Sequence, residues 1–212
     1  MEDTGKIRIG IIDSGLGGRY VSQQLMTNFE NIVTYQYTPD LFESYSAMSI
    51  ERLFLKADTH LQYLANLDVD VIVVGCMTMS TNCLNYIKEK AHVKKVYDLY
   101  TVLPFIHNDT IVLATDNTIK SGRFDHCTRV PCGHLSTAIE NGRSERLTQG
   151  LLWGFMQTNK AKPGRFIYGC SHYLWHKQAI SGVMGCEGID PVEYLMREMQ
   201  INEKKWNKPR RK

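Results

Sequence analysis

Short apolar runs alternate with longer amphipathic stretches along most of the chain. The apolar runs predict strands at residues 7–12, 32–37, 69–74, 93–96, 111–114, 128–130 and 166–168. The amphipathic stretches predict helices at about 19–28, 50–64 (capped by Ser49), 81–90, 135–141, 145–158 and 191–199, with a helical turn around Ile119. Strands that alternate with helices in this way indicate parallel sheets covered by helices on both faces.

The alternation starts again near Leu103-Pro104, which indicates two units of the same kind. The predicted division is a first α/β lobe over 1–102, a second lobe over 103–186, and a C-terminal segment over 187–212. This last segment is expected to hold a helix that returns to the first lobe, followed by a basic tail.

The composition is typical of a soluble globular protein. Of the 212 residues, 43% are hydrophobic and 22% are charged, which excludes a disordered chain, a collagen-like fibre and a coiled-coil rod. No apolar run approaches the roughly 18 to 20 residues that span a membrane, and the first residues lack a signal-peptide pattern. We therefore expect a cytoplasmic protein without membrane association. Its six cysteines include no Cys-x-x-Cys pair and are expected to be free thiols.

The basic charge is concentrated at one end of the chain. The last ten residues contribute +5 to the formal net charge of +3, so the other 202 residues carry −2. A nucleic-acid-binding fold spreads positive charge over its surface. Contact with nucleic acid is therefore expected at most through the tail 204–212, and the simpler interpretation of that tail is a solvated terminus.

Two distant segments of the sequence share one plan. Strand 69–74 leads into Gly75-Cys-Met-Thr78, and strand 166–168 leads into Gly169-Cys-Ser-His172. Ligands of open α/β sheets bind beyond the carboxyl ends of the strands, and the cysteine of each segment is placed there, as is Asp13 after the first strand. A helix N-terminus lowers the pKa of an adjacent thiol and favours the reactive thiolate.

Two such thiols, Cys76 from one lobe and Cys170 from the other, can face each other across a cleft. One thiolate then removes a proton from a bound carbon acid, while the other thiol returns a proton to the opposite face. This arrangement inverts a stereocentre without a cofactor. The alternative is that both are ordinary buried cysteines, because cysteine is among the most buried residue types.

The Gly-rich turn Asp13–Gly18 also follows a strand. Its backbone N–H groups can hold a phosphate, but Tyr20 breaks the dinucleotide-binding pattern and the Gly-Lys-Ser/Thr of a P-loop is missing. An acid and a hydroxyl at the head of the turn, Asp13 and Ser14, better suit an ammonium group or the orientation of a catalytic group. A plain strand-to-helix turn is the other interpretation.

Cysteines and histidines also cluster in the second half of the chain, at Cys132, His134, Cys170, His172 and His176. Their spacing does not provide the four ligands of a structural zinc site, so no metal is predicted. His172 is better interpreted as a charge partner for the thiolate of Cys170, two residues away.

Four segments spread over most of the chain carry one combined signal. They are Ile9-Gly-Ile-Ile-Asp-Ser-Gly-Leu-Gly-Gly18, Gly75-Cys-Met-Thr-Met-Ser80, Ala114-Thr-Asp-Asn-Thr-Ile-Lys-Ser121 and Gly169-Cys-Ser-His-Tyr173. In this order and at this spacing they resemble the motifs of the glutamate racemase family, within the aspartate/glutamate racemase superfamily. The usual forms of the two cysteine motifs in that family are Cys-Asn-Thr and Gly-Cys-Thr-His-Tyr-Pro.

The resemblance implies two similar doubly wound parallel-sheet lobes, related by a pseudo-twofold, with the active site in the cleft between them. It implies an isomerase that needs no cofactor and converts L-glutamate to D-glutamate for peptidoglycan by two-base proton transfer, commonly as a homodimer. By matching position, the catalytic residues are Cys76, Cys170, Asp13, His172 and Glu140. The substrate-binding residues are Ser14, Tyr45, Ser46, Thr78, Thr118 and Ser171.

Several positions depart from the family pattern. Met77 stands where the family has Asn, and a thioether cannot donate the lost hydrogen bond, whose absence in a dry site costs roughly 1–3 kcal/mol. Ser44 and Ser46 replace the Pro and Gly of a Pro-Tyr-Gly segment, and Leu174 replaces the Pro after His-Tyr. The alternatives are therefore a related enzyme that acts on aspartate or another carbon acid, and a racemase-like pseudoenzyme with a binding or regulatory role.

Overall fold

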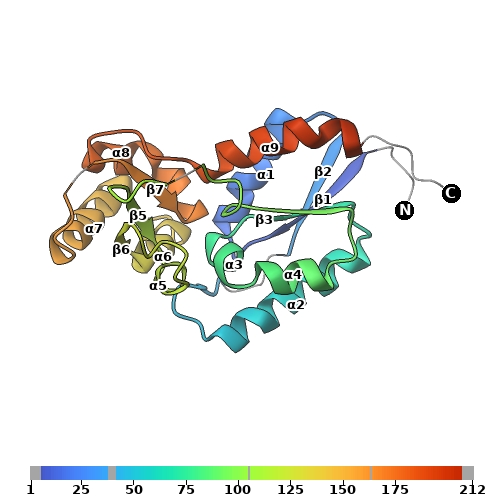
Figure 1. Cartoon of the computed structure of the whole chain (residues 1–212), viewed down its shortest axis with the longest axis horizontal. Coiled ribbons are helices and arrows are strands. Elements are labelled where there is room, and N and C mark those ends of the chain that lie inside the picture. Colours follow the sequence, from blue (N-terminus) through green and yellow to red (C-terminus); the bar gives the residue numbers. More distant parts are fainter. Residues whose placement is uncertain (1–5, 38–41, 105, 163, 207–212) are drawn as a thin grey trace.

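The structure, a computed structural model, describes residues 6–37, 42–104, 106–162 and 164–206, with side chains as far as Asn202. It confirms the predicted fold class, because the chain forms two α/β lobes that lie side by side, each built on a parallel sheet (Figure 1). No helix in these ranges is both long and apolar enough to cross a lipid bilayer.

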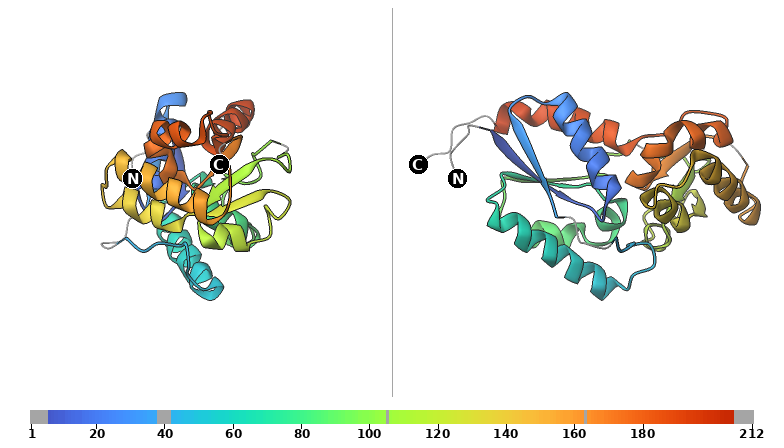
Figure 2. Two further views of the ribbon diagram at one scale, coloured as in Figure 1. Left: turned by 90° about the vertical axis from the view of Figure 1, so that its left-hand side faces the viewer. Right: turned by 180° about the vertical axis from the view of Figure 1, so that it is seen from behind.

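The first lobe contains a four-stranded parallel sheet in the order β2-β1-β3-β4. Its strands are β1 (Ile7–Ile12), β2 (Ile32–Gln36), β3 (Val71–Val74) and β4 (Lys95–Asp98), and its helices are α1 (Leu16–Asn28), α2 (Ile50–Asn66), α3 (Met77–Asn82) and α4 (Leu84–Lys90). Helix α1 covers one face of the sheet, and α2 and α4 lie on the other face (Figures 1 and 2).

The second lobe contains a three-stranded parallel sheet in the order β6-β5-β7. Its elements are β5 (Ile111–Ala114), α5 (Asp116–Lys120), β6 (Thr128–Pro131), α6 (Gly133–Glu140), α7 (Glu145–Thr158), β7 (Phe166–Gly169), the 3-10 helix η1 (Ser171–His176) and α8 (Lys177–Met184). The last helix, α9 (Pro191–Trp206), leaves this lobe and runs along the first one, where it contacts α1 and β4 (Figure 1). The boundaries 1–102, 103–186 and 187–212 themselves stay a prediction.

The two sheets share a strand order, since β2-β1-β3 corresponds to β6-β5-β7. Cys76 follows β3 and Cys170 follows β7, so the two cysteines occupy equivalent places in the two lobes. Asp13 follows β1 and Thr115 follows β5, which makes this pair equivalent as well. In both lobes the chain order reverses between the central strand and the cysteine strand, which is where α/β sheets bind ligands.

The apolar core explains why the strands are almost uniformly hydrophobic. Successive side chains of a strand point to opposite faces. Ile11 and Val73 therefore join the cluster under α1, and Ile12 and Val74 join the cluster under α2. The first cluster continues into the second lobe, where it includes Leu113, so the lobes share part of their core.

Several helices begin where the sequence predicts. The hydroxyl of Ser49 accepts a hydrogen bond from the backbone N–H of Arg52 and caps α2, and Ser144 caps α7 in the same way through Leu147. The predicted bounds of α7, 145–158, match the observed ones.

Other bounds differ from the prediction. Helix α1 begins at Leu16 instead of 19, and the single helix predicted over 81–90 is two helices, α3 and α4, that meet at Cys83. Strand β4 lies at 95–98 instead of 93–96, α8 was not predicted, and α9 continues beyond 199 to Trp206.

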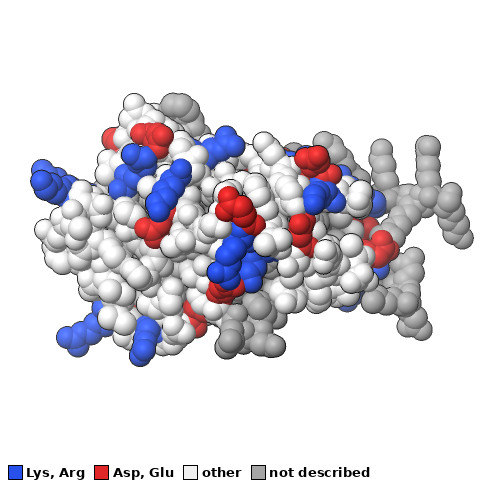
Figure 3. Space-filling model, turned by 90° about the horizontal axis from the view of Figure 1, so that it is seen from below, with Lys and Arg blue, Asp and Glu red and all other residues white. Residues whose placement is uncertain are grey.

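Charged side chains are mixed over the surface. On the face in Figure 3, Lys and Arg side chains lie among Asp and Glu side chains. Among the described residues, oppositely charged side chains form ion pairs such as Arg8–Asp68 and Lys56–Glu43, at 2.6 Å each. The basic tail, 204–212, lies outside the residues whose side chains are described.

Candidate active site

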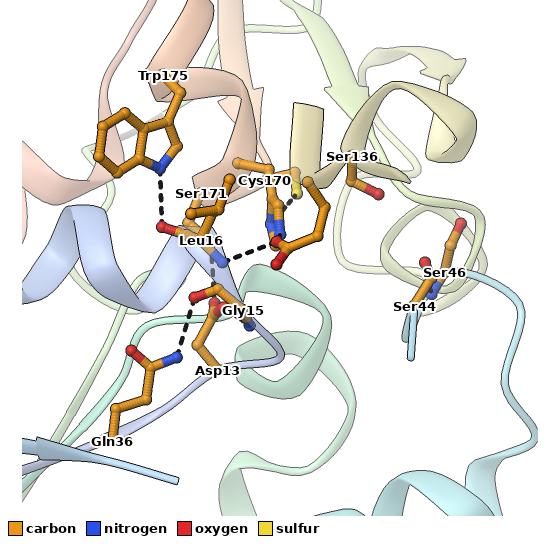
Figure 4. A network of polar contacts seen from close by, with 12 residues as sticks. Asp13, Gly15, Leu16, Gln36, Ser44, Ser46, Ser136, Cys170, Ser171 and Trp175 are labelled. Atoms are coloured by element: carbon orange, nitrogen blue, oxygen red, sulfur yellow. Dashed lines mark hydrogen bonds and ion pairs between the residues drawn. The ribbon is translucent and has the colours of Figure 1, made fainter. Parts of the chain in front are cut away.

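Asp13 connects the two lobes at the end of β1. Its side chain is fully buried, and its Oδ1 accepts a 2.9 Å hydrogen bond from the backbone N–H of Gly15. Its Oδ2 accepts a 3.0 Å bond from the hydroxyl of Ser171, which belongs to the second lobe (Figure 4). Burial raises the pKa of Asp13, while the charge of His172 and these hydrogen bonds act in the opposite direction.

The glycines after Asp13 are explained by the approach of the second lobe. A Cβ atom on Gly15 would lie 2.5 Å from Oε2 of Glu140, and one on Gly17 would lie 2.2 Å from Oγ of Ser171. Helix α1 therefore begins inside a Gly-rich turn, because a side chain there would push the lobes apart. The N–H of Leu16 donates to Oε2 of Glu140 at 2.8 Å, so this protein carboxylate takes the place that an anion such as phosphate would occupy at the helix N-terminus.

Cys170 begins a chain of three polar side chains in the second lobe. Its Sγ lies 3.7 Å from Nδ1 of His172, and Nε2 of His172 lies 2.7 Å from Oε2 of Glu140. Burial alone would lower the pKa of His172, but the hydrogen bonds to Cys170 and Glu140 and the nearby negative charges raise it to about 10. His172 therefore carries a positive charge at neutral pH, next to the sulfur of Cys170.

Glu140 completes this chain of side chains. Burial would raise its pKa, but the hydrogen bonds from His172 and from the backbone of Leu16 lower it below the usual range. The carboxylate is therefore ionised, and it fixes the imidazolium from one side while it binds the first turn of α1 from the other.

Cys76 lies in a different environment, although the sequence predicts the same behaviour for both cysteines. It is buried at the N-terminus of α3, next to the backbone N–H groups of Met79 and Thr78. Burial nevertheless raises its pKa well above the ordinary value, and the charges of Asp13 and Cys170 add to this effect. The predicted lowering of the Cys76 pKa is therefore wrong, because desolvation outweighs the few N–H groups of a short helix.

Three buried threonines form a closed triangle of hydroxyl groups between the lobes. Oγ1 of Thr78 lies 2.8 Å from Oγ1 of Thr115 and 3.2 Å from Oγ1 of Thr118, and the last two are 2.9 Å apart. Thr78 and Thr118 are predicted site residues that the structure brings together. Thr115 is an additional member, and its place in the Ala-Thr-x-x-Thr segment is the sequence signal for it.

Tyr45 and Ser46 lie at the edge of the first lobe, in the loop before α2. The hydroxyl of Tyr45 is 2.9 Å from Nε2 of His60, a buried residue of α2, so it is directed into the first lobe. Burial and the charges of Cys76 and Asp13 raise its pKa, and Tyr45 belongs to the same apolar cluster as Cys76. His60 was not predicted.

The Ser46 hydroxyl belongs to a contact between the lobes, because it donates to Oδ2 of Asp116 at 2.8 Å. Ser14 is buried beside Asp13. In the part of the chain that the structure describes, no group of three or more His, Cys, Asp or Glu side chains is arranged to hold a metal ion.

No protein-family model matches the chain. Among curated proteins, it is 26% identical to the glutamate racemase of Carboxydothermus hydrogenoformans, over 93% of this chain and 80% of that protein. It is 24% identical to the glutamate racemase of Clostridium acetobutylicum, over 82% of this chain and 75% of that protein. These relatives confirm the resemblance that the four sequence motifs indicate.

Solved structures confirm the two-lobed fold. The glutamate racemase of Francisella tularensis, solved in complex with D-glutamate, has a TM-score of 0.80 at 22% identity and covers 98% of this chain and 85% of its own. The enzyme of Thermus thermophilus, solved with β-chloro-D-alanine, has a TM-score of 0.81 at 21% identity, with 98% and 84% covered. An allantoin racemase of Pseudomonas fluorescens has a TM-score of 0.65 at 14% identity, with 98% of each chain covered.

Proposed function

Because the chain resembles glutamate racemases and is an isomerase of the amino-acid racemase type, we propose that it interconverts L- and D-glutamate by proton transfer between two cysteines, without a cofactor. One observation carries the proposal. Cys76 and Cys170 occupy equivalent places in the two lobes, and both take part in one buried electrostatic network with Asp13 and His172.

The reaction needs a base on one face of the substrate Cα and an acid on the other. In one direction the Cys170 thiolate takes the Cα proton, the C–H electron pair stays on Cα, and the Cys76 thiol donates its proton to the opposite face. The product is the mirror-image amino acid, and the two sulfurs have exchanged protonation states. The reverse direction starts from a Cys76 thiolate and a Cys170 thiol.

Charged neighbours assist each half of this transfer. The His172 imidazolium stabilises negative charge on Cys170, and Glu140 holds the imidazole ring in place. Asp13 is the proposed catalytic carboxylate of the first lobe, and its charge acts on Cys76. It also attracts the ammonium group of the substrate. A positive charge on the substrate in turn favours the ionised form of Asp13.

Polar groups around the thiols form the proposed substrate shell, namely Ser14, Tyr45, Ser46, Thr78, Thr118 and Ser171. The Thr78 and Thr118 hydroxyls bond to each other and can turn toward a substrate oxygen. The Tyr45 hydroxyl is held by His60, so this residue is proposed to act through its backbone.

Met77 favours a second candidate substrate. Its side chain is 1% exposed and belongs to the apolar cluster under α1, so an amide donor is missing where the family motif has one. Aspartate or another carbon acid is therefore the alternative. Further proposals from the resemblance are a supply of D-glutamate for peptidoglycan and a homodimer, and the composition adds a cytoplasmic location.

The direct test is proton NMR of the purified protein in D₂O with L- and D-glutamate and then with L- and D-aspartate. Loss of the Cα–H signal of both glutamate enantiomers, undiminished after dialysis against EDTA, is the expected result. Exchange of aspartate alone would move the assignment to the second candidate. Absence of exchange with all four amino acids, in protein that unfolds cooperatively, would contradict the proposed function.

A further inference from the structure

Asn117 makes an unusually dense set of contacts between the two lobes. It is the second residue of α5, and its Nδ2 donates to the carbonyl oxygens of Tyr45 at 2.8 Å and Met48 at 2.7 Å. Its backbone N–H donates to the carbonyl oxygen of Ser46 at 2.7 Å. One residue of the second lobe therefore binds three carbonyl groups within a four-residue segment of the first lobe.

Asn117 also contacts the helix that begins at Cys76. Its carbonyl oxygen accepts a 3.2 Å hydrogen bond from Nδ2 of Asn82, the last residue of α3. The same segment of α5 is held a second time, because Asp116 accepts a bond from the Ser46 hydroxyl and the backbone N–H of Asp116 lies 3.3 Å from that Oγ. Thr118, the next residue, belongs to the hydroxyl triangle.

The side-chain chemistry at position 117 is specific. Two carbonyl oxygens face the amide nitrogen, and only a side chain with two N–H donors on a short arm satisfies both. A carboxylate of the same shape has no donor and would face these oxygens with negative charge. Gly133 indicates how tightly this region is packed, because a Cβ atom there would lie 2.0 Å from Oγ of Ser46.

We propose that Asn117 is a positioning residue that sets the Tyr45–Met48 segment and α3 relative to the second lobe, and thereby shapes the substrate cleft. The inference rests on the proposed function for its kinetic consequences. Asn117 fixes the segment that carries Tyr45, and Tyr45 belongs to the same apolar cluster as Cys76. When its amide donors are lost, this segment shifts and substrate binding weakens.

The test compares Asn117→Ser and Asn117→Asp with the wild-type protein. Serine keeps the backbone N–H bond to Ser46 and loses the two amide bonds, so it is the milder change if the aspartate variant does not fold. The expected result is a KM for the exchanged amino acid about tenfold higher in Asn117→Ser and higher again in Asn117→Asp, with a smaller change in kcat. A purely structural residue would lower the unfolding temperature and leave the KM of the folded enzyme unchanged.

Asn159→Ser is the matched control. Asn159 also donates from Nδ2 to a carbonyl oxygen, that of Phe155 at 2.8 Å, but it is exposed at the end of α7. The KM of Asn159→Ser is expected to equal that of the wild type. An unchanged KM in both Asn117 variants would overturn the inference.

A measurement that does not use activity separates this inference from the proposed function. Amide hydrogen exchange of peptides covering residues 42–50 is expected to be at least about tenfold faster in Asn117→Ser than in the wild type and in Asn159→Ser. If the wild type racemises no amino acid but the exchange difference is present, the proposed function fails and the positioning of the segment stands. Equal exchange in all three proteins would overturn the positioning itself.

Discussion

The two cysteine turns have the same backbone plan and different chemical surroundings. Cys76 is followed by Met77-Thr78 and an α-helix, whereas Cys170 is followed by Ser171-His172 and a 3-10 helix. The Cys170 sulfur has an imidazolium at 3.7 Å, and the Cys76 sulfur has Asp13 as its strongest charged neighbour and a pKa raised mainly by burial. The same position in two similar sheets therefore carries a neutral thiol in one lobe and a cation-paired sulfur in the other.

This difference shows that the residues after each cysteine decide its electrostatic surroundings. The Cys170 sulfur lies 3.7 Å from Nδ1 of His172, whereas burial and the charge of Asp13 disfavour negative charge on Cys76. In the proposed mechanism, proton removal by Cys170 takes place beside the His172 imidazolium. The opposite enantiomer requires a thiolate on Cys76 instead.

Removal of either thiol is the largest expected effect. Cys76→Ala and Cys170→Ala should each lower racemisation by about a thousandfold or more, because each removes one of the two proton-transfer groups. Each variant is expected to lose proton removal from a different enantiomer, which deuterium incorporation from D₂O at early times would reveal. Cys186→Ala is the control, since that thiol donates to the carbonyl of Gly164 at 3.1 Å, outside the network of the two catalytic cysteines. Full activity in both cysteine variants would rule out the two-base mechanism.

The strands and most helices could be predicted from the sequence because their signals are local. Val71–Val74 and Ile111–Ala114 are completely buried strands, and a continuous apolar run is the pattern of such a strand. Ser49 and Ser144 stand at helix starts, where a side-chain oxygen can accept a backbone hydrogen bond.

The elements that were misplaced depend on contacts between distant residues. Gly17 and Gly18 are poor helix formers, yet α1 includes both. Their close neighbours come from other segments, because a Cβ atom on Gly17 would lie 2.2 Å from Oγ of Ser171 and one on Gly18 would lie 2.5 Å from Nε2 of Gln36. Helix α3 consists of Met, Thr, Ser and Asn, which do not give a helical pattern. Ser80 and Thr81 bond back to the carbonyl oxygens of Cys76 and Met77, at 2.9 and 3.0 Å.

The site residues also divide into those with a local sequence signal and those defined by contacts between distant residues. Asp13, Cys76, Cys170 and His172 could be selected because each follows a predicted strand end. The direction of the Cys76 pKa shift could not be predicted from its helix alone. It depends on how much water the folded lobes exclude, because burial raises this pKa and the helix N–H groups lower it. Asn117 and His60 were missed because a contact with another segment gives each of them its importance.

The pH dependence of His172 is the next largest effect. Its folded pKa of about 10 lies above its ordinary value of 6.5, so its contribution to stability is complete below pH 6.5 and is lost as the pH rises through about 10. The unfolding temperature of the wild type should therefore fall more between pH 7 and pH 10 than that of His172→Asn. The rate of racemisation of the enantiomer that Cys170 deprotonates should fall about a hundredfold in His172→Asn. His92→Asn, at an exposed position, should behave like the wild type, and equal pH slopes in His172→Asn and wild type would contradict the assignment.

Glu140→Gln should have a smaller effect on the same side of the cleft. The amide keeps the shape of the side chain and an acceptor oxygen, but it loses the charge that stabilises the His172 imidazolium. We expect about a tenfold loss of activity and a shift of the alkaline limb of the pH profile to lower pH. Glu145→Gln, an exposed carboxylate in the first turn of α7, is the control. A pH profile identical to the wild type would show that Glu140 does not act through His172.

Trp175→Phe should have the smallest effect. It tests whether activity depends on the contact that Trp175 makes between the two lobes. Nε1 of Trp175, in η1, donates to the carbonyl oxygen of Leu16 at 2.8 Å (Figure 4). The N–H of Leu16 in turn donates to Glu140. The ring also packs edge-on against Tyr20, with the centroids 5.8 Å apart. Phenylalanine keeps the ring contact and loses the N–H donor. We expect a loss of about 1 kcal/mol of the free energy that holds the two lobes together, and with it roughly a fivefold decrease in kcat/KM.

The control for this substitution is Trp153→Phe. Trp153 is 51% exposed on α7, so the loss of its indole N–H should leave kcat/KM unchanged. Because Trp175 binds the turn that follows Asp13, its loss should affect both enantiomers equally, unlike the changes at His172 and Glu140. A decrease confined to one enantiomer would instead mean that Trp175 acts on Cys170 through η1. Equal kcat/KM in the two tryptophan variants would show that the bond to Leu16 does not limit closure of the lobes.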